Sequence, residues 1–170
     1  SGIPSGFTEL DKITSGWQKS DLVIIAARPA MGKTAFVLSM AKNIAVDFNI
    51  PVAIFSLEMS NVQLINRLIM NVCEIEGSKI RNGRLSPSEW DRLENRINVL
   101  EKAPIYVDDT PGLSVFELQS KARKLVKDKK IQLIIIDYLQ LMNANGSSFG
   151  SREQEVSIIS RSLKGLAKEL

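Results

Sequence analysis

The sequence has no histidine, one cysteine and few aromatic residues, and each shortage excludes some chemistry. Without histidine the chain has no His-based catalytic triad, no histidine general base and no histidine metal ligand. Cys73 has no second cysteine for an internal disulfide or a structural zinc site, which is typical of a reduced, intracellular protein. Aromatic residues are 6% of the chain, so any nucleic-acid binding should depend on phosphate contacts more than on base stacking.

The chain also lacks long apolar segments and a large charge of either sign. No apolar run reaches the roughly 18 residues that span a bilayer, so we expect no membrane partner. The net charge of +3 permits a nucleic-acid partner but does not argue for one, because binding depends on local clustering. The 170 residues, 44% of them hydrophobic and 24% charged, predict a single globular domain over residues 1–170.

Four short apolar segments predict strands: residues 22–27 (LVIIAA), 52–57 (VAIFSL), 105–107 (IYV) and 133–136 (LIII). The three longer segments are apolar without alternation, which is typical of strands covered on both faces in a parallel sheet. Stretches with helical spacing lie between them. The order therefore predicts an α/β fold in which right-handed βαβ units place helices on both sides of the sheet.

Serine-led capping boxes mark most of the predicted helix starts, because a Gln or Glu follows each serine by three residues. These pairs are Ser60 and Gln63, Ser86 and Glu89, Ser114 and Glu117, and Ser151 and Gln154. The segment from Gly32 to Asp47 has no such cap, so its first amides need another partner. Residues 153–170 have helical apolar spacing, and a helix there would normally lead into a further strand. We therefore expect a fragment of a longer protein; a natural terminal helix is the alternative.

The segment ARPAMGKT indicates a phosphate-binding loop, because it directly follows a predicted strand and directly precedes a predicted helix. Main-chain amides of such a loop can hold phosphate oxygens, and Gly32 lets the backbone approach them closely. Lys33 would bring its charge to the β- and γ-phosphates, and Thr34 offers a hydroxyl to Mg²⁺. The generic pattern has glycine in place of Ala27, so a chance GKT remains the alternative. The predicted nucleotide-binding residues are Ala27, Arg28, Pro29, Ala30, Met31, Gly32, Lys33, Thr34 and Ala35.

Two further carboxylates are predicted at the same edge of the sheet. Asp137 ends the apolar run LIII and is the favoured metal-binding Walker B aspartate, with Thr34 as the second metal ligand. Asp108 and Asp109 compete for that role, but the turn formers after them favour a part in shaping a turn.

Glu58 follows the second strand and could activate the attacking water; a solvated acid before a helix cap is the alternative. Glu58 and Lys33 are thus the candidate catalytic residues.

The segments GIPSGF, ARPAMGKT, FSLEM, DDTPG and IIIDYLQLM, in this order, resemble the bacterial replicative DNA helicases of the DnaB type. The resemblance covers nearly the whole chain, and that family accepts alanine at the first position of its phosphate loop. It implies a RecA-like P-loop NTPase fold, here the first part of the C-terminal ATPase domain and without its final strands. It also implies an ATP-hydrolysing motor that uses Mg²⁺, translocates on single-stranded DNA and unwinds duplex DNA. A homohexamer, a primase, a helicase loader and a cytoplasmic, nucleoid-associated location in bacteria follow from the same resemblance.

A glycine- and serine-rich loop over residues 143–152 is the candidate DNA contact, with a flexible surface loop as the alternative. Its candidate phosphate-binding residues are Gly146, Ser147, Ser148, Gly150 and Arg152. The lysine-rich stretch at residues 121–130 is denser in charge, but a solvated helix face explains it. Trp17, Phe36 and Trp90 are expected to pack in the protein rather than to stack on bases.

Two other functions remain open from the sequence. The chain could be a nucleotide-gated binding or scaffold module of the RecA-like class without productive turnover. A recombinase or a circadian-clock ATPase of the same superfamily is a further alternative, against which only the resemblance of FSLEM and DDTPG argues.

Overall fold

The computed structural model describes residues 2–20, 23, 32–73, 79, 82–137 and 152–170. In chain order the elements are α1 (Thr8–Thr14), α2 (Lys33–Lys42), the π-helical turn η1 (Asn43–Asp47), β1 (Val52–Ser56), α3 (Asn61–Cys73), α5 (Pro87–Lys102), β2 (Ile105–Asp108), α6 (Val115–Lys129), β3 (Leu133–Asp137) and α7 (Arg152–Glu169). The strand expected at residues 22–27 lies outside the described residues, except for Val23.

The three described strands form a parallel sheet in the order β2-β1-β3. The register pairs Phe55 of β1 with Asp108 of β2, and Ser56 of β1 with Asp137 of β3. The carboxyl ends of the three strands therefore lie at one edge, where open α/β sheets bind ligands.

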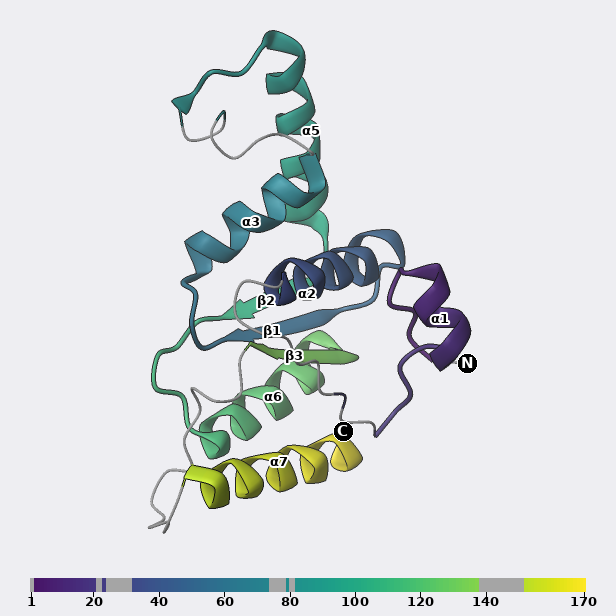
Figure 1. Cartoon of the computed structure of the whole chain (residues 1–170), viewed down its shortest axis with the longest axis vertical. Helices are drawn as coiled ribbons and strands as arrows, with labels where there is room; N and C mark the ends of the chain where they lie inside the picture. Colours follow the sequence, from purple (N-terminus) through teal and green to yellow (C-terminus); the bar gives the residue numbers. More distant parts are fainter. Residues whose placement is uncertain (1, 21–22, 24–31, 74–78, 80–81, 138–151) are drawn as a thin grey trace.

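Helices cover both faces of this sheet, with α2 and α3 on one side and α6 and α7 on the other (Figure 1). Successive side chains of the central strand, β1, pack alternately into two hydrophobic cores. Val52 and Ile54 pack with the buried residues of α2 and α3, whereas Ala53 and Phe55 pack with those of α6 and α7. The expected α/β architecture, with strands apolar on both faces, is confirmed. No helix in the described part of the chain is long and apolar enough to cross a bilayer.

Two of the four predicted capping boxes form in full, and a third forms in part. Ser86 and Glu89 bond each other's main-chain amides at the start of α5, and Ser60 and Gln63 do the same before α3. Ser114 accepts a hydrogen bond from the amide of residue 117 at the start of α6. The fourth pair begins at Ser151, which lies outside the described residues.

The N-terminal segment packs against α2 through aromatic contacts. Phe7 stacks on Phe36 with ring centroids 5.0 Å apart, and the indole N–H of Trp17 donates to the sulfur of Met40 at 3.3 Å. Trp17 and Phe36 are thus packing residues, as expected. Trp90, on α5, is 46% exposed, so it is not a core residue. Helix α5 extends away from the sheet beyond α3 (Figure 1).

Candidate nucleotide site

Gly32 is the N-cap residue of α2 and has a left-handed conformation, with φ of 78°. Among the described residues, no side chain caps this helix. L-residues rarely adopt that backbone conformation, which explains the glycine. A β-carbon added at Gly32 would meet no atom of the described residues within 4 Å, so they leave the space beside it open. The first amides of α2 lack a side-chain cap beside this open space, and such an arrangement favours an anion.

Asp137 lies beside the first residues of α2, although more than a hundred positions separate them in the sequence. Its carboxylate is 3.4 Å from the Lys33 ammonium, and the Thr34 hydroxyl donates to it, also at 3.4 Å. Asp137 is 4% exposed. The fold therefore brings together one cation, one hydroxyl and one buried carboxylate, all predicted as site residues from the sequence.

Oxygen ligands are what Mg²⁺ prefers, and it usually takes one or two protein ligands together with substrate phosphates and water. The Thr34 hydroxyl and the Asp137 carboxylate fit that ligand set. Among the described residues, no three of His, Cys, Asp and Glu gather into a complete metal cage.

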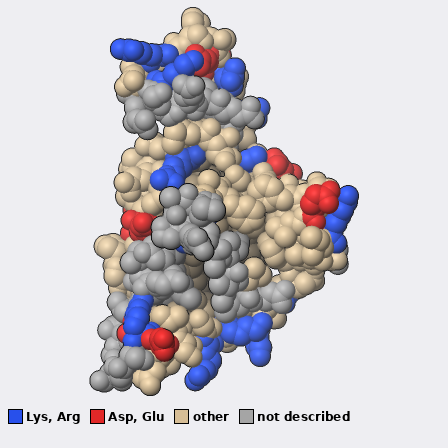
Figure 2. Space-filling model, in the orientation of Figure 1, with Lys and Arg blue, Asp and Glu red and all other residues tan. Residues whose placement is uncertain are grey.

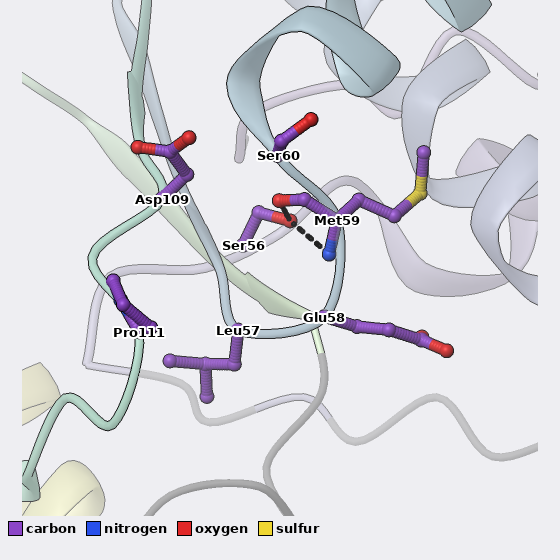
Figure 3. Close-up of a pocket in the computed structure, with 7 residues that line it drawn as sticks. All are labelled: Ser56, Leu57, Glu58, Met59, Ser60, Asp109 and Pro111. Carbon is purple, nitrogen blue, oxygen red and sulfur yellow. Dashed lines mark hydrogen bonds between the residues drawn. The ribbon is translucent and has the colours of Figure 1, made fainter.

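Glu58 lies on the turn between β1 and α3, at the same edge of the sheet as Asp137. The amide of Leu57 donates to the main-chain carbonyl of Asp137 at 2.7 Å, which joins this turn to the end of β3. Glu58 is exposed, and its carboxylate points away from Asp109 and Pro111 (Figure 3). A hollow of about 210 Å³ separates the Glu58 turn from the turn after β2.

Asp108 and Asp109, the competing aspartates, have other partners. Asp108 accepts from the Lys121 ammonium at 2.7 Å and from the amide of Thr110 at 2.9 Å. Burial raises the pKa of Asp108, but the hydrogen bonds from Lys121 and Thr110 outweigh it and leave the pKa below its ordinary value of 3.8. Asp109 accepts from the amide of Asn61 at 2.7 Å. Both carboxylates thus organise turns in this structure, as the sequence favours.

The remaining predicted contacts lie mostly outside the described residues. These are the loop residues Ala27, Arg28, Pro29, Ala30 and Met31 and the candidate DNA contacts Gly146, Ser147, Ser148 and Gly150. Ala35 is exposed in the first turn of α2. Arg152 begins α7 and forms an ion pair with Glu155.

Part of the lysine-rich stretch on α6 has intramolecular partners. Lys121 binds Asp108, Arg123 pairs with Glu169 at 2.6 Å, and the Lys129 ammonium lies 5.7 Å from the ring centroid of Tyr106. Such contacts favour a structural role for these three charges. Figure 2 shows Lys and Arg on one face scattered among acidic side chains rather than in one continuous patch.

Two contacts that shape the site were not predicted from the sequence. Ser56, the last residue of β1, both donates to the carbonyl and accepts from the amide of Met59, at 2.7 and 3.2 Å. The Asp109–Asn61 bond joins residues 48 positions apart. The first contact has a local signal, a serine before a turn. The second depends on strand order and has none.

Comparison with known proteins identifies close relatives. Residues 2–170 match the family described as DnaB-like helicase C terminal domain. The chain is 52% identical to a replicative DNA helicase DnaB of Nostoc sp. and 51% identical to one of Geobacillus stearothermophilus. Both matches cover 99% of this chain, but the chain spans only 19% and 37% of those relatives' lengths.

Comparison with solved structures also finds similar proteins. The chain superimposes with a TM-score of 0.90 and 40% identity on a DnaB-like replicative helicase whose structure concerns its interactions with primase. It superimposes equally well on a second solved chain, which is described as an ATPase domain. These matches cover 99% of this chain and 41% and 60% of the solved chains. The RecA-like class expected for the fold is confirmed by these neighbours.

Proposed function

The chain belongs to the DnaB-like helicase C-terminal domain family, and on that basis we propose that it is part of the ATP-driven motor of a replicative DNA helicase. The observation that supports this most directly is the cluster of Lys33, Thr34 and Asp137 beside the uncapped start of α2. Membership of this family sets aside the recombinase and clock-ATPase alternatives.

In the proposed mechanism the start of α2 binds the phosphates of ATP. The amides of its first turn and the Lys33 ammonium hold phosphate oxygens and stabilise the charge that develops on them. Thr34 and Asp137 would hold Mg²⁺, which when bound supplies Lewis-acid stabilisation to the phosphate oxygens. Lys33 lies 3.4 Å from the carboxylate of Asp137, so its charge is already at this edge of the sheet.

Glu58 is the proposed general base. Its carboxylate takes a proton from a water molecule while the water oxygen forms a bond to the γ-phosphorus and the bond to the ADP oxygen breaks. Two features support this assignment: Glu58 follows β1, whose last residue pairs with Asp137, and its carboxylate is exposed where water can reach it.

The wider activity is also part of the proposal. Hydrolysis would drive translocation on single-stranded DNA and duplex unwinding by a homohexamer in the cytoplasm, with Gly146, Ser147, Ser148, Gly150 and Arg152 as candidate phosphate contacts. A primase is a proposed partner, because one solved relative is described together with its interactions with primase. A helicase loader is proposed from the family resemblance alone.

The test measures nucleotide binding and steady-state ATP hydrolysis, with and without single-stranded DNA, on the protein at its full natural length. We expect Lys33→Ala to lose nucleotide binding or turnover. We expect Glu58→Gln to bind ATP normally but to hydrolyse it at least about a hundredfold more slowly, the usual effect of losing a general base. Glu101→Gln, an exposed glutamate on α5, is the matched control.

Three results would contradict parts of the proposal. Near-normal hydrolysis by Lys33→Ala would remove the phosphate-binding assignment. Undiminished hydrolysis by Glu58→Gln would move the general base elsewhere. Nucleotide binding without any turnover by the unmodified protein, with or without DNA, would indicate a nucleotide-gated module instead.

A further inference from the structure

The turn that carries Glu58, residues 57–60, is held by main-chain and side-chain hydrogen bonds on several sides. Leu57 donates its amide to the carbonyl of Asp137 at 2.7 Å. Ser56 bonds both the amide and the carbonyl of Met59, so the turn closes on the end of β1 (Figure 3). These bonds fix the turn relative to β1 and β3, which are its neighbours on one side.

Asp109 holds the same turn from the other side. Its carboxylate accepts a hydrogen bond from the amide of Asn61, the first residue of α3 and three positions beyond Glu58. This is a charge-assisted bond at 2.7 Å, and bonds of that kind are roughly twice as strong as neutral ones. It connects the turn after β2 to the start of α3, directly after the Glu58 turn.

The turn that bears Asp109 is itself braced. Lys121 of α6 donates to Asp108 at 2.7 Å and to the hydroxyl of Thr110 at 3.0 Å, and Asp108 accepts the Thr110 amide. The residues on both sides of Asp109 are therefore tied to one lysine. Asp109 is presented from a fixed strand end rather than from a free loop.

Asp109 binds a helix-start amide, that of Asn61, which the capping box of α3 does not pair. The start of α3 already has a complete capping box, in which the amides of Ser60 and Gln63 find partners in each other's side chains. Asp109 supplies the partner for the Asn61 amide from the end of another strand. Its distinct effect is to fix the position of that start, and so of the preceding Glu58, relative to β2.

We propose that Asp109 is a positioning residue for ATP hydrolysis, which acts by holding the Glu58 turn against the end of β2, with Ser56 holding the same turn against the end of β1. This inference rests on the proposed function, because it requires Glu58 to activate the water. A displacement of about 1 Å at a reacting group can cost as much as a hundredfold in rate. Nucleotide binding depends on α2 and should not change.

The experiment uses Asp109→Ala in the full-length protein, with DNA-stimulated ATP hydrolysis and equilibrium binding of ATP as readouts. We expect kcat to fall about tenfold or more while KM and Kd for ATP stay within about twofold, the pattern of an interaction lost only in the transition state. Asp109→Asn keeps an oxygen that can accept from Asn61 and should recover most of the rate. Asp128→Ala, an exposed aspartate on α6, is the matched control and should leave kcat unchanged.

A double variant separates positioning from a general structural effect. If Asp109 acts through Glu58, then adding Asp109→Ala to Glu58→Gln should slow single-turnover hydrolysis by less than about twofold further, because the effects of residues that act as one unit are not additive. Ser56→Ala, combined with Glu58→Gln in the same way, tests the other side of the turn and serves if Asp109→Ala does not fold. We expect the same fall in kcat for Ser56→Ala as for Asp109→Ala, and the same lack of additivity with Glu58→Gln.

Outcomes that overturn the inference differ from those that overturn the proposed function. Normal kcat in Asp109→Ala, alongside a slow Glu58→Gln, would refute positioning by Asp109 and leave the general base in place. Full additivity with Glu58→Gln would likewise refute action through Glu58. A fast Glu58→Gln would instead refute the catalytic assignment itself.

Discussion

The ion pair between Asp108 and Lys121 allows a prediction about stability and pH. The two groups are 2.7 Å apart, and their side chains are 22% and 40% exposed. A hydrogen bond to a charged group contributes about 1.5–3 kcal/mol when shielded from water. Because Lys121 is substantially exposed, solvent screening reduces this, and we expect a coupling free energy of about 1 kcal/mol.

The dependence on pH follows from the lowered pKa of Asp108. Burial raises this pKa, but the bonds from Lys121 and Thr110 hold it below 3.8 in the folded state. A depressed folded-state pKa stabilises the protein above the unfolded pKa, and this stabilisation is lost as pH falls through the folded value. The coupling should therefore be complete near neutral pH and should disappear progressively below the ordinary value of 3.8.

The measurement is a double-mutant cycle of Asp108→Asn and Lys121→Met, followed by urea unfolding between about pH 7 and about pH 3. One kcal/mol corresponds to about 2–4 °C in Tm for a domain of this size, so thermal unfolding is a second readout. Lys124→Met, on the exposed face of the same helix, controls for the loss of a lysine. A coupling below about 0.3 kcal/mol at neutral pH, or one that persists unchanged in acid, would refute the reasoning.

Two further predictions concern the fold. Gly6 and Gly83 both have positive φ, but an added β-carbon at Gly6 would lie 2.4 Å from the β-carbon of Asn43, whereas at Gly83 it would meet nothing within 4 Å. Gly6→Ala should therefore destabilise the protein by more than the roughly 1–2 kcal/mol of backbone strain expected for Gly83→Ala, and equal losses in urea unfolding would contradict this. Phe55 is fully buried at the centre of the sheet, so Phe55→Ala should cost about 3–5 kcal/mol of unfolding free energy; a loss below about 1 kcal/mol would show that Phe55 does not support that core.

Much of the secondary structure can be predicted from the sequence because its determinants are local. A serine and a glutamate three residues apart can cap a helix wherever it lies, as Ser86 and Glu89 do. The apolar run that becomes β3 has a similar local basis, although its strand also includes Asp137. The strand predicted at residues 52–57 ends one residue earlier, at Ser56, although the Leu57 amide still bonds the carbonyl of Asp137.

Exposure is harder to predict, because it depends on what other elements cover. Trp90 has the size and hydrophobicity of a core residue, yet it lies on α5 with 46% of it exposed. The sequence alone does not show how far α5 extends beyond the sheet.

The residue types of the candidate nucleotide site were determined by the sequence itself: a glycine that can adopt positive φ, then a lysine and a threonine at a helix start, and a carboxylate that ends an apolar strand. Only the tertiary structure decided which of several acids would meet that helix. The order β2-β1-β3 and its register bring Asp137 to Lys33 and send Asp109 to Asn61. Strand order is set by packing across the whole sheet, and no local stretch of residues encodes it.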